Sequence, residues 1–187
     1  MHAWKRESDY GPVFADPVLD SEENRLIVSH VSGKIIALET SKGEVQWELD
    51  FGININFFFE PMRIDSTLLL QPSNQGTLFI LNLVEGRIVQ SIQLGESSSR
   101  LLTPSVFSHD STAFVQVADT CAGLHVLQME NNTIKKCCKV SFLAGDSFSK
   151  PALVGTAAGK VKTVLGSRDD CVYCIEYDCT KFNNKND

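Results

Sequence analysis

The chain has 187 residues, of which 43% are hydrophobic, 9% aromatic and 21% charged. This length and composition are ordinary for one globular domain or slightly more, and they exclude a disordered or fibrous protein. The 23 acidic residues outnumber the 17 basic ones, which gives a net charge of −6. That balance argues against nucleic acid and anionic membranes as partners, because both require a basic face.

The first residues, Met1 to Glu7, contain no apolar run of the kind that a signal peptide needs. No stretch reaches the ~18 apolar residues of a membrane helix. We therefore expect an intracellular, cytoplasmic protein without a membrane partner, in which the six cysteines are reduced thiols.

A motif that begins with proline occurs four times along the chain. The prolines are Pro17, Pro61, Pro104 and Pro151, and successive copies lie 44, 43 and 47 residues apart. Each proline is followed by short apolar runs bounded by Gly, Ser, Asn and Asp, which is typical of β-strands. Proline is tolerated at the start of a strand because that position can forgo its ladder hydrogen bond.

Glycine opens several of the later runs. Gly33, Gly76 and Gly123 precede the third run of the first three copies, and Gly43 and Gly86 precede the fourth run of the first two. Such turns often need a positive φ. Four strands per unit at this period is the spacing of propeller blades. We therefore predict an all-β fold, a β-propeller of four-stranded blades. A β-sandwich is disfavoured because all four copies keep the same order of features.

The tryptophans extend the repeat toward the N-terminus. Trp47 lies 14 residues before Pro61, and Trp4 lies 13 before Pro17. We therefore place Trp4 in the last strand of a preceding blade. The predicted units are that strand (1–10), three blades (11–52, 53–96 and 97–142), a partial blade (143–178) and a polar tail (179–187). These units contain sixteen strands: the first strand, twelve in the three blades and three in the partial blade. Sixteen strands could form either a closed four-bladed ring or part of a longer propeller, and we favour the longer propeller.

Two segments resemble known repeats. Ala37 to Trp47 resembles the pyrroloquinoline-quinone-type propeller repeat, with an Ala-Leu-acidic start, a Thr-x-x-Gly turn and a tryptophan four residues after the glycine. Leu165 to Glu176 is similar to the C-terminal end of the beta-alanine-activating enzyme family, in which adenylation and phosphopantetheine carrier domains accompany a propeller of this type. The resemblance implies a non-catalytic accessory module of an ATP-dependent amino-acid-activating enzyme, whose partners are those domains or another protein.

A fragment of a quinone-dependent oxidoreductase is the alternative function. Enzymes with this repeat hold pyrroloquinoline quinone (PQQ) and calcium on the propeller axis, and several carry a vicinal disulfide that Cys137-Cys138 could match. We interpret the pair as two strand residues that face opposite sides. The acidic residues show no calcium-loop spacing. We therefore expect no PQQ, no calcium and no catalytic residue in this chain. A stand-alone interaction scaffold is a third possibility.

Other residues of metal or nucleophilic sites lack the required arrangement. Cys171 and Cys174 are three residues apart in a predicted strand, so they face opposite sides and cannot both bind one metal. His30, His109 and His125 have no serine or cysteine nearby in a nucleophilic pattern. We expect structural roles for the three histidines and no metal site.

Phe57, Phe58 and Phe59 form the candidate partner-binding patch. Three successive aromatic residues in a strand cannot all face one core, although propeller blades bury both faces. They therefore indicate either an inter-blade core or a patch on the propeller rim. The residues expected to shape the repeat are Trp4, Pro17, Gly33, Gly43, Trp47, Pro61, Gly76, Gly86, Pro104, Gly123 and Pro151.

Overall fold

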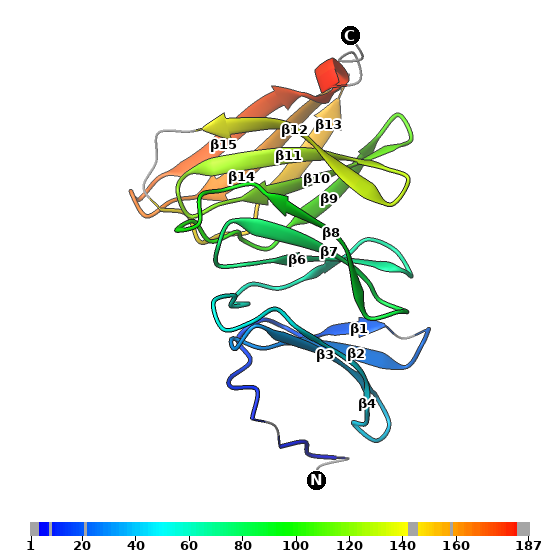
Figure 1. The fold of residues 1–187 in the computed structure, drawn as a ribbon. Helices are drawn as coiled ribbons and strands as arrows, with labels where there is room; N and C mark the ends of the chain where they lie inside the picture. The colour runs from blue at the N-terminus through cyan, green and yellow to red at the C-terminus, as the bar shows by residue number, and fades with distance from the viewer. Residues whose placement is uncertain (1–3, 8, 21, 142–145, 158, 183–187) are drawn as a thin grey trace.

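The computed structural model describes residues 4–7, 9–20, 22–141, 146–157 and 159–182. Within this part of the chain, fifteen strands form four antiparallel sheets, and one 3-10 turn (η1, Cys179–Phe182) follows the last strand. Figure 1 shows the four sheets stacked one after another in chain order. The prediction of an all-β chain is confirmed.

Each sheet is a blade whose strands follow sequence order from one edge to the other. Blades I to III have four strands each and blade IV has three. Their bounds are β1 (Val18–Asp20), β2 (Arg25–Ser29), β3 (Lys34–Glu39) and β4 (Val45–Asp50) in blade I; β5 (Met62–Arg63), β6 (Leu68–Pro72), β7 (Thr77–Asn82) and β8 (Arg87–Gln93) in blade II; β9 (Ser105–His109), β10 (Thr112–Ala118), β11 (Gly123–Glu130) and β12 (Thr133–Ser141) in blade III; and β13 (Ala152–Ala157), β14 (Lys160–Gly166) and β15 (Val172–Asp178) in blade IV.

The repeated prolines mark where the blades begin. The first strands β1, β5, β9 and β13 start directly after Pro17, Pro61, Pro104 and Pro151. Each proline therefore stands just outside the ladder, where its missing N–H leaves no hydrogen bond unmade. The period found in the sequence is thus the period of the sheets.

A residue with positive φ stands at one place in the turn between the second and third strands of every blade. Gly33 (φ 84°) and Gly76 (φ 69°) hold this place in blades I and II. Ala122 (φ 60°) holds it in blade III and Asp170 (φ 63°) in blade IV. Gly123 opens the third strand of its blade as predicted, but the positive φ of this turn falls one residue earlier, on Ala122.

The pairing of third and fourth strands contains a bulge in each of the three four-stranded blades. The register shifts after Ala37, Ile80 and Val126. These residues face Trp47, Gln90 and Cys138 across the ladder, so those three side chains occupy one equivalent position. Cys137 falls on the bulge, and its side chain lies outside the described side chains.

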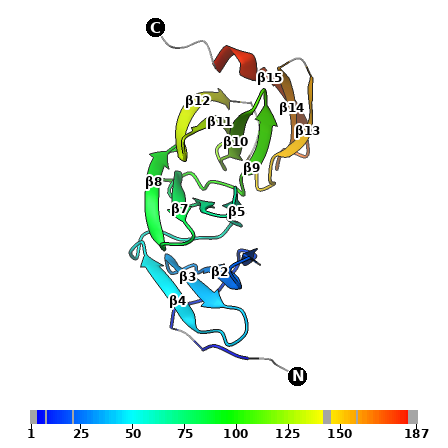
Figure 2. The ribbon, with the colours of Figure 1, turned by 90° about the vertical axis from the view of Figure 1, so that its right-hand side faces the viewer.

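The blades pack face to face into an open arc. Apolar clusters lie at the three junctions and include Ile27, Leu69 and Leu81 between blades I and II, Leu70, Val115 and Leu127 between II and III, and Phe114, Val126 and Val161 between III and IV. Figure 1 places the two ends of the chain at opposite ends of the arc, and in Figure 2 the fourth strands β4, β8 and β12 follow one another along one side. The chain therefore does not close on itself as a four-bladed ring.

The N-terminal segment covers the outward face of blade I. Trp4 and Tyr10 pack against Val28, Ile36 and Leu38 on that face. Residues 4–7 form no strand, unlike the strand predicted over 1–10. A strand needs a ladder partner, and no third strand of a preceding blade lies beside this segment within the described residues. Residues 1–3 and 8 of the predicted strand lie outside the described part.

Candidate functional site

Trp47 joins blade I to blade II. Its indole Nε1 donates a hydrogen bond of 2.9 Å to the carbonyl oxygen of Leu83. The ring lies against Gly86, where an added Cβ would come within 2.5 Å of Trp47 Cγ. Gly86 also has a φ of 60°. The glycine therefore provides both the turn conformation and the room for the indole.

Trp4 makes the same contact one junction earlier. Its Nε1 donates to the carbonyl oxygen of Thr40 at 2.8 Å. A Cβ on Gly43 would lie 2.7 Å from Trp4 Cε3. Trp4 therefore occupies, relative to blade I, the position that Trp47 occupies relative to blade II.

Gln90 replaces the tryptophan at the junction of blades II and III. Its Nε2 donates to the carbonyl oxygen of Ile134 at 2.9 Å, and its Oε1 accepts from the N–H of Ile134 at 2.8 Å. Two hydrogen bonds to one backbone residue thus take the place of a stacked ring. The amide satisfies a donor and an acceptor that would otherwise lie unpaired between the blades.

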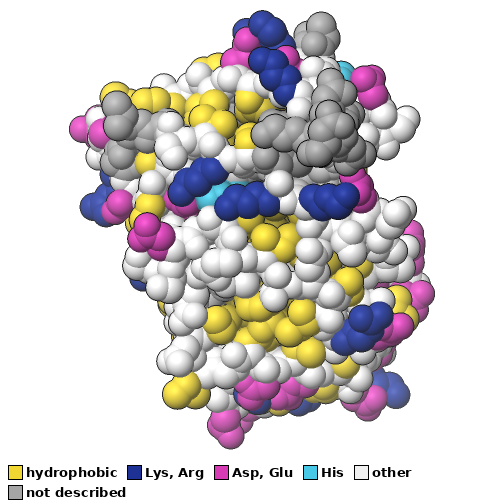
Figure 3. All heavy atoms as spheres, turned by 45° about the horizontal axis from the view of Figure 1, so that its top comes forward, with side chains coloured by type: hydrophobic (Ala, Val, Ile, Leu, Met, Phe, Trp, Pro, Cys, Tyr) yellow, Lys and Arg dark blue, Asp and Glu magenta, His cyan; other side chains and the backbone are white. Residues whose placement is uncertain are grey.

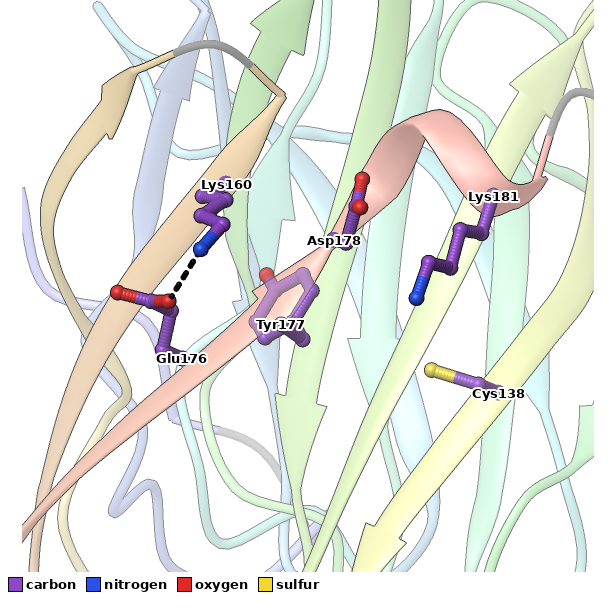
Figure 4. Close-up of a pocket in the computed structure, with 6 residues that line it drawn as sticks. All are labelled: Cys138, Lys160, Glu176, Tyr177, Asp178 and Lys181. Atoms are coloured by element: carbon purple, nitrogen blue, oxygen red, sulfur yellow. Dashed lines mark ion pairs between the residues drawn. The ribbon is translucent and has the colours of Figure 1, made fainter.

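Cys138 occupies the same position at the junction of blades III and IV, and a hollow of about 450 Å³ lies beside it. Figure 4 shows Tyr177 in the middle, Cys138 and Lys181 on one side, and the Lys160–Glu176 ion pair on the other. That pair spans 3.3 Å from Nζ to Oε1. The thiol is much smaller than an indole, so it leaves open the volume that Trp47 fills between blades I and II.

Burial limits the chemical reactivity of two groups beside this hollow, Cys138 and Tyr177. Burial raises the pKa of the Cys138 thiol, so it stays protonated near neutral pH and is a weak nucleophile. Burial also raises the pKa of Tyr177. The hollow therefore offers shape and mixed surface charge rather than an activated group.

A buried hydrogen-bond network fixes blade IV to blade III. Gln116 Oε1 accepts from Thr163 Oγ1 at 2.6 Å and from the Tyr177 hydroxyl at 3.1 Å. Ser29 Oγ donates to Gln71 Oε1 at 2.6 Å between blades I and II in a similar way. Such bonds orient neighbouring blades, because a wrong alignment would leave buried polar groups unpaired.

His125 and Asp119 form a buried pair within blade III. Both are 0% exposed, and His125 Nε2 lies 2.7 Å from Asp119 Oδ2. Burial alone would raise the pKa of Asp119, but hydrogen bonds from His125 and from the N–H of Gly123 hold the pKa below its ordinary value. A Cβ on Gly123 would lie 2.5 Å from Asp119 Oδ2, so only glycine leaves room for the carboxylate. The pair fixes the turn before β11, which is a structural role.

The segments that lead into each blade lie along one side of the arc, which we call the linker face (residues 10–17, 51–61, 94–104 and 146–151). Each segment accepts, through a backbone carbonyl, a hydrogen bond from an N–H of the turn between the second and third strands. The four bonds are Val31 N–Pro12 O, Asn74 N–Asn56 O, Thr120 N–Arg100 O and Arg168 N–Asp146 O, at 2.9 to 3.1 Å. The repeat therefore places the same linker positions side by side on one surface.

Phenylalanines recur on the linker face at the third position before the proline. Phe14 is 66% exposed, Phe148 is 46% exposed and Phe58 is half-buried. The ring centroids of Phe14 and Phe58 are 6.2 Å apart. Guanidinium groups lie over two of the rings, Arg100 at 4.9 Å from the Phe58 centroid and Arg168 at 5.8 Å from that of Phe148. The linker face thus carries exposed aromatic rings with arginines over them.

Phe57, Phe58 and Phe59 do not form one surface patch. Phe57 is 0% exposed and packs edge-on against Phe51 at 5.1 Å, in the core between blades I and II. Phe59 packs against the cluster of blades III and IV. The three residues precede β5 rather than lying in a strand, so their side chains diverge. Of these three residues, only Phe58 lies beside Phe14 at the surface of the linker face. Counting three residues back from each proline would have indicated Phe14 and Phe148 as well.

The cysteine and acidic side chains are the groups that could bind a metal ion. Cys171 and Cys174 are both exposed and free. In the part of the chain that the structure describes, no three His, Cys, Asp or Glu side chains gather closely enough to hold a metal ion. Within the same residues, no helix has the length and apolar character needed to cross a membrane.

Comparison with known proteins supports the fold. No protein-family model and no curated protein matches the sequence. The WD40 β-propeller domain of Doa1 aligns with a TM-score of 0.68 at 14% identity, over 94% of this chain and 54% of that one. The computationally designed protein Ika4 aligns with a TM-score of 0.68 at 12% identity, over 94% and 97%. BamB from Moraxella catarrhalis aligns with a TM-score of 0.52 at 15% identity, over 94% and 66%.

These likenesses confirm the predicted fold class: the chain has a β-propeller fold. The chain spans about half the length of the Doa1 domain that it matches. Identities this low show the fold alone. The resemblance to beta-alanine-activating enzymes gains no support from these structures and rests on Leu165 to Glu176.

Proposed function

We propose that the chain is a non-catalytic propeller module that binds a partner protein through its linker face. The observation that carries the proposal is the repeated phenylalanine position, where Phe14 and Phe148 are exposed, Phe58 is half-buried, and arginines lie over the rings of Phe58 and Phe148. Aromatic residues and arginine are enriched in protein interfaces and among the residues that dominate binding energy. The propeller scaffold holds these side chains at fixed spacing, which lowers the entropic cost of binding.

The arginines strengthen the case energetically. A cation over an aromatic ring contributes about 0.5–1 kcal/mol at an exposed site and about 2 kcal/mol once water is excluded. Arg100 over Phe58 would therefore gain stabilisation when a partner covers both side chains. Phe14 lies next to Phe58 and would extend the covered apolar area.

We further propose that the partner is the adenylation and carrier region of a beta-alanine-activating enzyme, as the resemblance of Leu165 to Glu176 implies. The propeller would act there as an accessory platform in the cytoplasm.

The test is a calorimetric titration of this chain with a purified adenylation–carrier fragment of a beta-alanine-activating enzyme. Phe14→Ala and Phe148→Ala should each weaken binding about 5- to 30-fold, the range of an interface anchor. Val84→Ala is the matched control, because Val84 is 53% exposed but lies in the turn between β7 and β8, away from the linker face. It should change the dissociation constant less than twofold.

Two outcomes would contradict the proposal separately. Folded chain that gives no heat with the fragment rejects the proposed partner. Binding that Val84→Ala weakens as much as the phenylalanine variants do rejects the linker face as the docking surface.

The proposal also includes the expectation that the chain binds neither PQQ nor calcium. Adding PQQ, with and without calcium, should leave the absorbance spectrum of the quinone unchanged. Stoichiometric quinone binding, or dehydrogenase activity with a dye acceptor, would instead support the oxidoreductase alternative.

A further inference from the structure

The fourth strands form the outer edges of the blades. β4, β8 and β12 each pair on one side with the third strand of their own blade and end their sheet on the other side. In Figure 2 the three strands follow one another along one side of the arc. Alternate residues of such an edge turn their N–H and C=O groups outward, so an extended peptide can add a further strand there. The charges of the three edges then decide which peptide each edge accepts.

β12 differs from the other two outer strands in length and charge. It has nine residues, against six in β4 and seven in β8. Lys135, Lys136 and Lys139 give β12 three positive charges, and its sequence contains no acidic residue. β4 carries Glu48 and Asp50 instead. Figure 3 shows basic side chains in a row across one face of the molecule. A chain with a net charge of −6 thus has a basic outer edge in blade III.

The three lysines of β12 are exposed to solvent. Lys135 Nζ lies 2.5 Å from Glu130 Oε2, and both side chains of this pair are exposed. Water screens such a pair, so an acidic ligand can replace it at little cost. Lys139 Nζ lies 3.5 Å from Asp119 Oδ2. Lys136 has no ion-pair partner among the described residues, so its charge is available to a ligand.

The bulge in β12 brings Lys136 and Lys139 onto one face of the strand. Lys136 pairs with Leu127 of β11. Lys139 pairs with His125, two residues earlier in β11, and residues two apart in a strand share a face. Without the extra residue of the bulge, two lysines three positions apart would lie on opposite faces. A peptide strand beside β12 would therefore meet both lysines with side chains of a single face.

The start of this edge already binds a group from outside the blade. Gln90 of blade II accepts from the Ile134 N–H at 2.8 Å and donates to the Ile134 carbonyl at 2.9 Å. One amide thus satisfies both backbone groups of this residue, as a paired strand would. Between the described residues, no further backbone hydrogen bond joins the outer edge of β12 to another segment. The remainder of the edge keeps the groups that an added strand would pair with.

We propose that the edge of β12 from Lys135 to Ser141 binds an acidic, extended peptide segment of a partner protein by strand addition. The backbone edge supplies the hydrogen bonds, and Lys136 and Lys139 select the charge. Lysines on an edge oppose pairing between two copies of the same strand, because like charges would meet, and so they favour an acidic partner over a second copy. The edge shares no residue with the linker face, so this proposal and the proposed function can fail independently.

Fluorescence anisotropy of the full chain with a labelled peptide of alternating glutamate and threonine tests the choice of charge. The reference peptide has glutamine in place of each glutamate. The acidic peptide should bind at least about tenfold more tightly at low salt, and the difference should shrink at high salt. Lys136→Glu should weaken binding of the acidic peptide about 3- to 20-fold, because it replaces an attraction by a repulsion.

Lys42→Glu is the matched control for Lys136→Glu. Lys42 is exposed in the turn between β3 and β4 of blade I, and its replacement changes the net charge of the chain by the same amount. It should leave the dissociation constant of the acidic peptide nearly unchanged. Circular dichroism should show that both variants keep the sheets, because both positions are exposed.

N-methylation of the peptide tests the strand pairing. Methyl groups on alternate residues remove alternate N–H donors, and only one of the two alternating sets faces β12 in an added strand. One set should weaken binding at least about tenfold, and the other set should change it little. Hydrogen exchange in the complex should be slowed in β12 and unchanged in β4 and β8.

Four results would overturn the proposal. They are no binding of the acidic peptide, equal binding of the acidic and glutamine peptides, equal losses in Lys136→Glu and Lys42→Glu, and equal effects of the two N-methylated sets. Single-stranded poly-uridine RNA is the competing polyanion. If it binds as tightly as the acidic peptide, with the same loss in Lys136→Glu, the assignment of a peptide ligand is wrong.

Discussion

The contact between Trp47 and Gly86 allows a quantitative test of how the blades are held together. Trp47→Ala removes the hydrogen bond to Leu83, worth about 1 kcal/mol, and roughly 100 Å² of buried indole, worth about 2.5 kcal/mol. The free energy of unfolding should therefore fall by about 3.5 kcal/mol. Gly86→Ala imposes a positive φ on alanine, which costs about 1–2 kcal/mol, and pushes the indole away. Gly86→Ala should therefore lower the free energy of unfolding by about 4 kcal/mol in total.

The double variant distinguishes this account from two independent effects. Both substitutions remove the same packing, so together they should cost about 4–5 kcal/mol rather than the sum of the single effects. Gly52→Ala is the matched control: it has φ 84° but nothing within 4 Å of an added Cβ. Gly52→Ala should lower the free energy of unfolding by about 1–2 kcal/mol, and this loss should add to that of Trp47→Ala. Urea unfolding followed by circular dichroism measures all five variants, including the double variant of Gly52→Ala and Trp47→Ala. Additivity of Trp47→Ala and Gly86→Ala within about 0.5 kcal/mol would refute the reasoning.

Three further predictions concern the inner junctions and blade III. Cys138→Trp should fill the hollow between blades III and IV and raise the melting temperature by about 2–4 °C in calorimetry; a decrease would show that the hollow cannot take the indole. Gln116→Leu should lower the free energy of urea unfolding by about 1–3 kcal/mol, because it leaves the Thr163 hydroxyl unpaired; an unchanged midpoint would contradict this role. The lowered pKa of Asp119 gives stability that is present above its ordinary pKa near 3.8 and lost as pH falls through the lowered value. Asp119→Asn should therefore be less stable at pH 7 and lose less stability on acidification below about pH 4; parallel pH curves would contradict it.

The sequence predicted the features of the fold that depend on local chemistry. Proline and glycine constrain the backbone directly, so Pro61 marks the start of β5 and Gly86 marks a turn. The spacing between Trp4 and Trp47 also predicted that both belong to one repeated position, and both donate to a backbone carbonyl at a junction.

Features that depend on neighbouring blades could not be predicted in the same way. Trp4 stands at the distance from Pro17 expected of a fourth strand, but residues 4–7 have no partner strand among the described residues. Nothing in the sequence of residues 4–7 indicates that this partner strand is missing. Ala122 takes a positive φ because the buried Asp119 side chain fixes the turn through its hydrogen bonds to the Cys121 and Gly123 N–H groups. Phe57 and Phe58 are adjacent in sequence, yet one enters the core and the other reaches the surface.

Hydrogen exchange of the chain with and without the adenylation–carrier fragment tests the proposed docking surface most directly. Because bound surfaces exchange more slowly, we predict that protection appears in the linker segments 10–17, 51–61, 94–104 and 146–151. The outer strands β4, β8 and β12 should exchange at unchanged rates. Protection confined to those outer strands, with unchanged linkers, would contradict the account.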